Sequence, residues 1–250
     1  MSDKMKTTEN DAVSATEDVG AAKLNDRRTF LKWGGASLTA LALVNAGSIT
    51  AFANPKTKMK GSQQQTATIN LGTGDTAIAN FAYLLEQLEA DFYSRVVANN
   101  FYAGATAEER QILTDLRDHE IIHREFFKAL LGANGIPQLP AFDFSLVDFN
   151  SRDSVLTNAQ AMEDTGVSAY NGAGQAIVSP DVLAIAGKIV SVEGRHAAAI
   201  RDLRIPRNGY FAPHSADFAL DPLEVLTLVS PYVPRTVTVN ASGLPRIIVV

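Results

Sequence analysis

The amino-acid sequence predicts an all-α fold, a four-helix bundle with one long crossover, followed by a Pro-rich C-terminal extension with short strands. Three observations lead to this prediction. Four segments carry the spacing of apolar side chains that is typical of amphipathic helices. The links between these segments are short, long and short in turn. Six of the ten prolines follow Arg204, where they would break any long helix.

The first two helices are expected at residues 73–99 and 106–131. The second begins with a capping box, in which the Thr106 hydroxyl and the Glu109 carboxylate would satisfy free backbone amides. It is expected to end before Gly132, because glycine favours the backbone conformation that closes a helix. The Lys, Gln and Thr-rich residues 54–72 before the first helix indicate a linker or an ordered arm.

The third helix is expected at residues 153–175. The fourth begins with Ser179 as its cap and Pro180 at the first helical position, and it ends before Pro206. Residues 133–152 between the second and third helices are long enough to cross the length of a bundle. A short-long-short pattern of connections indicates a single crossover rather than a simple up-and-down bundle.

The C-terminal extension has mixed character. A short helix is expected at residues 222–229, and residues 236–240 and 247–250 have the composition of strands. The predicted organisation is a leader at 1–53, a linker at 54–72, the bundle at 73–204 and the extension at 205–250.

Composition and charge exclude several functional classes. The chain of 250 residues is 46% hydrophobic and 20% charged, an ordinary balance for a globular protein. Because it has no cysteine, any bound metal must use histidine, carboxylate or backbone oxygen ligands. The net charge of −5 gives no basic field for a phosphate backbone, which argues against nucleic acid as a partner.

The N-terminal leader has the features of an export signal. The pair Arg27 and Arg28 precedes a moderately apolar stretch at 33–53, which resembles a twin-arginine signal. We expect cleavage after Ala53, and a retained N-terminal anchor is the alternative. The resemblance implies that the twin-arginine machinery exports a folded protein to the periplasm or cell exterior, often with its cofactor already inserted.

Two helices carry an acidic residue and a histidine inside their inward-facing apolar stripes. The second helix places Glu120 and His123 in this stripe, and the fourth places Glu193 and His196 there, three residues apart in each case. The stripe of the second helix is Leu113, Leu116, Glu120, His123, Phe127 and Leu130; that of the fourth is Val182, Ala186, Ile189, Glu193, His196, Ile200 and Leu203.

The first and third helices each carry a glutamate with a tyrosine seven residues later. Glu86 is followed by Tyr93, and Glu163 is followed by Tyr170. Each of these helices precedes one of the two Glu-x-x-His helices, so the chain contains a diverged two-helix repeat. Such a duplication is what a two-fold-symmetric bundle core requires.

Four carboxylates in a bundle interior need compensation. Each would lose several kcal/mol of solvation if it were ionised and unpaired, on the order of the penalty known for buried ions. No lysine or arginine falls in the four stripes. Two divalent cations would neutralise the four charges, and each ion would have one histidine. The open alternative is a bundle whose polar groups bond among themselves without metal.

The stripes resemble those of the ferritin-like di-iron and di-manganese carboxylate superfamily. Residues 84–93 (LLEQLEADFY) and 119–123 (HEIIH) are similar to its exported, desiccation-related subfamily, and the resemblance covers about 73–204. It implies two iron ions, with manganese as the alternative, and the metal ligands Glu86, Glu120, His123, Glu163, Glu193 and His196. Within this set Glu120 and Glu193 are the expected bridging carboxylates. Tyr93 and Tyr170 resemble tyrosines that hydrogen-bond ligand carboxylates, although both could be plain core aromatics.

Three further polar residues are assigned more weakly. Glu89 lies on the face of Glu86, but its repeat counterpart is Gly166, so we treat it as a secondary ligand or a carboxylate at the rim of the site. His119 lies on a different face from Glu120, as expected of a surface or interhelix histidine. His214 belongs to the Pro-rich extension and is expected to face solvent.

The resulting functional hypothesis is an exported di-metal protein acting on peroxide, dioxygen or ferrous iron. The reaction would be of the peroxidase, catalase-like or ferroxidase type, with no catalytic residue assigned. The competing hypothesis is a non-catalytic metal-binding or stress-protective protein. An iron-storage cage fits less well because of the long extension after Arg204, and formation of a homo-oligomer is left open.

Overall fold

A computed structural model describes residues 67–207 and 209–247 of the chain. The leader and its expected cleavage site lie outside these residues, as do residues 54–66 and 248–250. The described helices are α2 (Gly74–Val97), α3 (Asn100–Gly104), α4 (Ala107–Leu131), α5 (Arg152–Ala173), α6 (Pro180–Arg204) and α7 (Pro222–Val229). Two strands, β1 (Ala67–Asn70) and β2 (Val237–Asn240), complete the regular structure together with three single-turn 3₁₀ helices.

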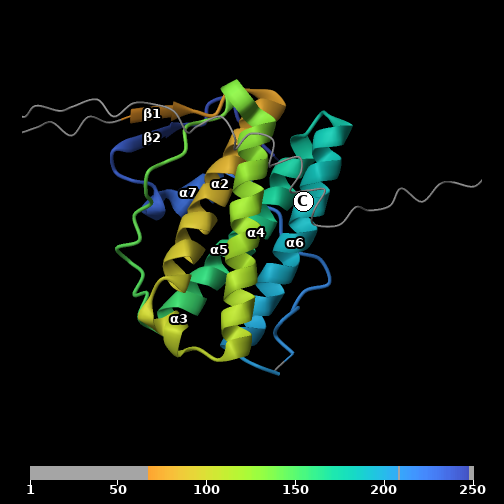
Figure 1. Ribbon diagram of the computed structural model, residues 1–250. Helices are drawn as coiled ribbons and strands as arrows, with labels where there is room; N and C mark the ends of the chain where they lie inside the picture. The colour runs from red at the N-terminus through yellow and green to blue at the C-terminus, as the bar shows by residue number, and fades with distance from the viewer. Residues whose placement is uncertain (1–66, 208, 248–250) are drawn as a thin grey trace, which may run out of the picture. The chain divides into compact units, whose positions relative to one another are not determined.

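The predicted all-α bundle with one crossover is confirmed. Helix α2 packs against α4 and helix α5 against α6, which gives two helical hairpins. The segment between α4 and α5 runs back along the bundle, so that α5 begins at the end of the bundle where α4 began (Figure 1). None of the helices in 67–207 and 209–247 has the length and apolarity needed to cross a bilayer.

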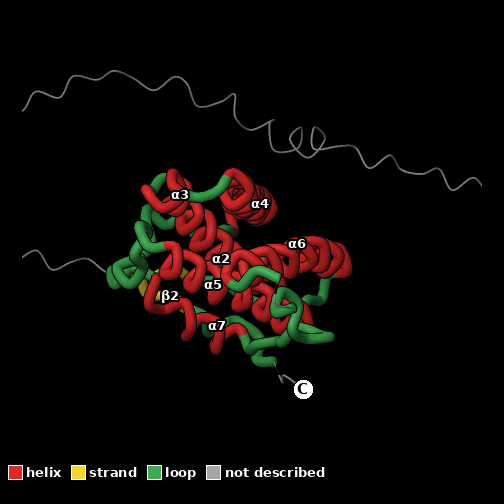
Figure 2. The backbone as a smooth tube through the Cα atoms, turned by 90° about the horizontal axis from the view of Figure 1, so that it is seen from below, coloured by secondary structure: helices red, strands yellow, loops and turns green. Residues whose placement is uncertain are grey.

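Helix α2 is the most enclosed element of the bundle. Every residue from Ala77 to Ala90 is buried, because other elements cover this helix on all sides. Seen along the bundle, α2 and α5 lie between α4 on one side and α7 on the other (Figure 2). A helix that is covered all round must satisfy its polar side chains within the protein.

Three polar side chains of α2 fasten the crossover to it. The Asn80 side chain accepts a hydrogen bond from the Ile136 amide at 2.8 Å and donates to the carbonyl oxygens of Leu71 and Asn134. About two and three turns further along, Gln87 accepts from the Leu139 amide and Asp91 accepts from the Phe142 amide. These contacts give the irregular crossover fixed backbone partners along the length of α2.

The helix ends differ slightly from the sequence prediction. The Thr106 hydroxyl caps α4 by accepting from the Glu109 amide, as expected, but the Glu109 carboxylate accepts from Arg152 Nε at 2.8 Å instead of closing the capping box. The last inward position of α4 is Leu131, which is buried, while Leu130 is 43% exposed. The stripe of α4 therefore advances by four residues after Phe127, not by three.

The C-terminal extension is packed onto the bundle. Strand β2 pairs in parallel with β1, with Ala67 opposite Val237, so part of the expected linker is a strand. The backbone of the extension also lies directly on α5. The Leu220 amide donates to the Ser168 carbonyl, and a Cβ at Gly172 would lie 1.9 Å from the Leu220 carbonyl oxygen. Only glycine permits this close approach.

Candidate metal centre

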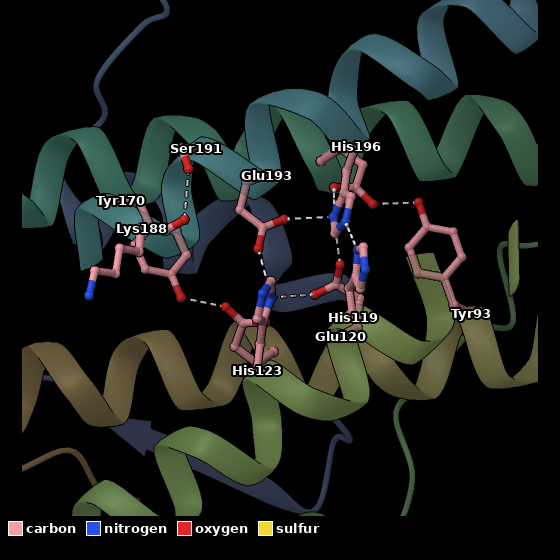
Figure 3. Close-up of polar contacts among 11 residues, drawn as sticks. Tyr93, His119, Glu120, His123, Tyr170, Lys188, Ser191, Glu193 and His196 are labelled. Atoms are coloured by element: carbon pink, nitrogen blue, oxygen red, sulfur yellow. Dashed lines mark hydrogen bonds and ion pairs between the residues drawn. The ribbon is translucent and has the colours of Figure 1, made fainter. Parts of the chain in front are cut away.

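Each of the four long helices contributes to one buried polar cluster in the middle of the bundle. Its residues are Glu86 from α2, Glu120 and His123 from α4, Glu163 from α5, and Glu193 and His196 from α6. His123 is the most exposed of the six at 8%. The structure thus brings together all six residues that were predicted as candidate ligands. Figure 3 shows Glu120, His123, Glu193 and His196 pointing toward one another.

The first half of the cluster is centred on Nδ1 of His123. This nitrogen lies 2.9 Å from a carboxylate oxygen of Glu193 and 3.4 Å from oxygens of both Glu86 and Glu120. One ligand atom from each of these four residues falls within a set no wider than 4.8 Å. Ligands on opposite sides of one divalent ion are separated by about 4 Å, so the spread suits a single ion.

The second half is centred on Nδ1 of His196 and mirrors the first. This nitrogen lies 2.8 Å from Glu120, 3.1 Å from Glu193 and 3.5 Å from Glu163. Glu120 and Glu193 each place one oxygen near His123 and the other near His196. Glu86 contacts only His123, and Glu163 contacts only His196. The two halves share two carboxylates, which is the arrangement of a dinuclear site with two bridging ligands.

Many polar atoms of the cluster lie close together without forming hydrogen bonds to one another. Oxygens of Glu86, Glu163 and Glu193, both oxygens of Glu120 and Nδ1 of His123 are fully buried without an aligned hydrogen bond. A ring nitrogen can donate only one proton, so it cannot satisfy three carboxylates. Buried polar groups without partners are rare in native structures and point to an ion or water among them. The donor set of oxygen and imidazole nitrogen fits iron or manganese.

The electrostatics of the cluster show how it balances charge without a cation. Burial, together with the neighbouring Glu193, raises the pKa of Glu120 to about 8. Burial also opposes ionisation of Glu193, but the close ring nitrogens of His123 and His196 lower its pKa to about 2. Burial would lower the pKa of each histidine, yet the surrounding carboxylates raise both above the ordinary value. Protons therefore compensate part of the negative charge, and they would compete with metal ions.

The two tyrosines hold the two carboxylates that serve one half each. The Tyr93 hydroxyl donates to Glu163 at 2.5 Å, and the Tyr170 hydroxyl donates to Glu86. Both side chains stay protonated, because burial and the charge of their own glutamate raise the pKa of each phenol well above its usual value. They lie at opposite ends of the cluster (Figure 3), each fixing the orientation of one candidate ligand.

His119 touches the cluster from the outside. Its Nδ1 lies 2.9 Å from Nε2 of His196, and the two rings are stacked 5.1 Å apart. Burial and the neighbouring imidazoles lower the pKa of His119, which favours the neutral ring. When His119 accepts the Nε2 proton of His196, the Nδ1 of His196 is left free to face the carboxylates. The repeat does not supply His123 with an equivalent partner, because the residue of the second half that corresponds to His119 is Val192.

The two remaining candidates are not among the clustered ligand atoms. Glu89 is buried but belongs to neither group of ligand atoms. Burial, and then the charges of the four stripe glutamates, raise its pKa well above its usual value. His214 is exposed in the extension, where its ring contacts Phe218.

The sequence interpretation missed the contact between His119 and His196. The only available signal was the pair of histidines four residues apart in α4, His119 and His123. Their faces on the helix did not show which neighbour His119 would meet.

Comparison with known proteins supports the superfamily on independent grounds. The family model described as the ferritin-like domain matches residues 74–205, more than half of the chain and the whole of the four-helix bundle. No curated protein matches the chain. With four helices, a single crossover and a buried glutamate and histidine cluster at its centre, this chain belongs to the ferritin-like family.

Proposed function

We propose that this protein binds two iron ions, with manganese as the alternative, and acts on peroxide, dioxygen or ferrous iron. The observation that carries the proposal is the sharing of two carboxylates between two histidine-centred groups. Glu120 and Glu193 each have one oxygen within 3.4 Å of Nδ1 of His123 and the other oxygen within 3.4 Å of Nδ1 of His196. A single structural ion would need only one of these groups.

The residues divide into two sets of equal composition. Glu86 and His123 would hold one ion, Glu163 and His196 would hold the other, and the two shared glutamates would bridge them. Four carboxylates and two divalent ions give a neutral interior, which removes the desolvation problem of the stripes. Paired iron or manganese ions, once bound, supply one electron each and so suit two-electron chemistry on an oxidant.

The protein's own side chains set the conditions for that chemistry. The apolar residues around the cluster exclude bulk water, because the six candidate ligands are at most 8% exposed. Tyr93 and Tyr170 keep two carboxylates from rotating, and His119 fixes which nitrogen of His196 faces the centre.

The same burial favours a second candidate, a non-catalytic metal site that stabilises the bundle. A structural metal site is closed to solvent and keeps no open position for a substrate. In this reading the protein would bind metal and resist stress, as in the desiccation-related subfamily that the sequence resembles. Turnover of an added oxidant separates the two candidates, because both bind metal.

The leader supports export as a further part of the proposal. Arg27 and Arg28 stand directly before the moderately apolar stretch, as in a twin-arginine signal. This route carries folded proteins, so the metal would enter before transport, and the protein would work in the periplasm or outside the cell.

The deciding experiment is elemental analysis of protein purified after native export. We expect close to two iron or manganese ions per chain in the wild type. His123→Ala and His196→Ala should each lower the content to one ion or fewer, and the exposed His214→Ala should leave it unchanged. Equal content in all three variants would overturn the dinuclear assignment.

Assays of the loaded protein then test the reaction. Peroxide consumption and ferrous oxidation are measured side by side on wild type and on the two depleted variants. Turnover that falls with metal content supports the oxidoreductase. Full metal content without turnover of peroxide, dioxygen or ferrous iron would favour the structural role.

A further inference from the structure

Glu89 is a buried carboxylate without a partner among the described residues. It lies on α2 one turn beyond Glu86 and is only 4% exposed, yet it takes no hydrogen bond in 67–207 or 209–247. Asn80 and Gln87, two other buried polar side chains of this helix, each accept a hydrogen bond from the crossover, although Nε2 of Gln87 has no partner. A carboxyl group in this position needs water or another small molecule as its hydrogen-bond partner.

The space beside Glu89 exists because the facing residue is glycine. A Cβ at Gly166 would lie 3.3 Å from Oε1 of Glu89, tighter than an ordinary contact. A glycine in a helix interior costs about 1 kcal/mol relative to alanine, and Gly166 lies within α5. Gly166 is also the repeat counterpart of Glu89. The two halves of the repeat therefore differ here, with a carboxylate on one side and room for it on the other.

Glu89 and Gly166 line a cavity of about 130 Å³. Its walls come from α2, α5 and the C-terminal extension, including Met162, Leu228 and Tyr232. A cavity of this size has room for several water-sized molecules. Leu228 is 53% exposed and Ala161 of α5 is also exposed, so both the extension and α5 contribute to the side of the wall that meets solvent.

The cavity adjoins the metal centre on the side away from the histidines. Glu89 and Gly166 each stand three residues after a candidate ligand, Glu86 on α2 and Glu163 on α5. These are the two glutamates that serve one half of the centre each, while both histidines come from α4 and α6. A molecule in the cavity would therefore be about one helical turn from both halves of the centre.

We propose that this cavity is the chamber through which hydrogen peroxide reaches the metal centre, with Glu89 as the hydrogen-bonding group that receives it. The proposal rests on the proposed function and names the substrate. The walls other than Glu89 are mostly apolar, which disfavours ions, and the volume excludes large molecules. Peroxide is small and neutral and can both donate to and accept from a carboxyl group, which supplies the partner that Glu89 lacks.

Another cavity of the described bundle is a poorer candidate. It has a volume of about 30 Å³ and lies near Tyr170, between Phe127 and Ile185. Its lining has no polar side chain except Tyr170, whose hydroxyl is already bonded to Glu86. It has room for a water-sized molecule but presents no unpartnered group to bind one.

The test uses two chamber variants, each with a matched control. Leu228→Trp enlarges a side chain at the solvent side of the chamber, and Leu146→Trp makes the same change at a position that is 72% exposed and outside the lining. Gly166→Ala fills the space beside Glu89, and Gly187→Ala adds a methyl group on α6 where nothing lies within 4 Å. Metal content and circular dichroism establish that each variant is folded and loaded.

The first readout is independent of turnover. Xenon binding to the zinc-loaded protein, followed by ¹²⁹Xe NMR, reports the cavity itself, because xenon occupies small apolar cavities. We expect saturable binding in wild type and both controls, and at least tenfold weaker binding in Leu228→Trp and Gly166→Ala. Equal binding in chamber and control variants would overturn the chamber.

The second readout is peroxide turnover by the iron-loaded or manganese-loaded full chain. We expect kcat/KM to fall at least tenfold in both chamber variants with a much smaller change in kcat, and to stay within threefold in the controls. Glu89→Gln keeps shape and hydrogen bonding and should stay within about threefold of wild type, while Glu89→Leu should lose tenfold or more.

The outcomes separate the two proposals. If wild type consumes peroxide and the chamber variants do so with unchanged kcat/KM, the chamber is refuted and the proposed function stands. If metal-loaded wild type oxidises ferrous iron but does not consume peroxide, peroxide as the occupant is refuted while the metal site stands. If wild type binds no metal, both proposals are refuted.

Discussion

Replacing Tyr93 by phenylalanine tests whether the tyrosines support the metal centre or merely fill the core. The hydroxyl of Tyr93 donates to Oε1 of Glu163 at 2.5 Å, and both residues are 0% exposed. The second oxygen of Glu163 already lacks an aligned donor. After Tyr93→Phe the carboxylate would keep only His196, whose Nδ1 is 3.5 Å away.

The expected cost follows from this geometry. A hydrogen bond to a charged group contributes about 1.5–3 kcal/mol, so the metal-free protein should lose about that much stability. For a chain of this size the melting temperature should fall by about 3–12 °C. The freed carboxylate can rotate or take up a proton, so the affinity for the ion on the His196 side should drop about 10–100-fold. The ion on the His123 side should be unaffected.

Thermal melts of the metal-free protein and titration against a competing chelator measure these two effects. Tyr102→Phe is the matched control, because the Tyr102 hydroxyl bonds a neutral, partly buried Thr114 hydroxyl at 2.8 Å. The reasoning would be refuted if Tyr93→Phe cost no more stability than this control. It would also be refuted if both metal-binding steps weakened equally.

Three further predictions follow. The metal-free protein should become less stable as pH rises from about 5 to 8, because folding raises the pKa of Glu120 to about 8. Protonated Glu120 stabilises the fold fully below the pKa of the unfolded chain, and this stabilisation is lost as pH rises through the pKa of the folded protein. The metal-loaded protein should show the reverse trend because protons compete with metal, and melts of both forms compare them; parallel curves would contradict the linkage. Gly172→Ala should destabilise the protein by about 1–3 kcal/mol in urea unfolding, since its Cβ would meet the Leu220 carbonyl oxygen; stabilisation would show that the extension does not pack there. Changing Arg27 and Arg28 together to lysine should trap the protein in the cytoplasm, which cell fractionation measures, and normal export would remove the twin-arginine assignment.

The general arrangement of the fold could be predicted from the spacing of residues along the sequence. Glu120 and His123 were recognisable because they interrupt an apolar stripe and because Glu193 and His196 repeat the pattern. Both signals are local and periodic, so they survive without knowledge of tertiary contacts. The structure brings the six candidate ligands together, while their occupation by metal stays a prediction.

Features that depend on how helices face one another were not accessible in this way. The contact of His119 with His196 depends on the rotation of α4 relative to α6. The cavity beside Glu89 needs Gly166 on another helix and Leu228 from the extension. The composition of residues 236–240 indicated a strand, which β2 confirms, but the sequence did not show that this strand would pair with Ala67–Asn70.

The parallel strand pair has a consequence for the order in which the protein assembles. Ala67 and Val237 face each other although they lie 170 positions apart in the chain. Contacts between such distant positions carry a large loop-closure cost until the intervening chain is compact, so this pair closes after the helices have formed. Helix α7 and the turn at Ser230–Tyr232 lie just before β2, so they too can settle onto α5 late. Until the extension docks, Leu228 and Tyr232 do not cover the Glu89 side of the bundle, so that side stays open to solvent while the four helices pack.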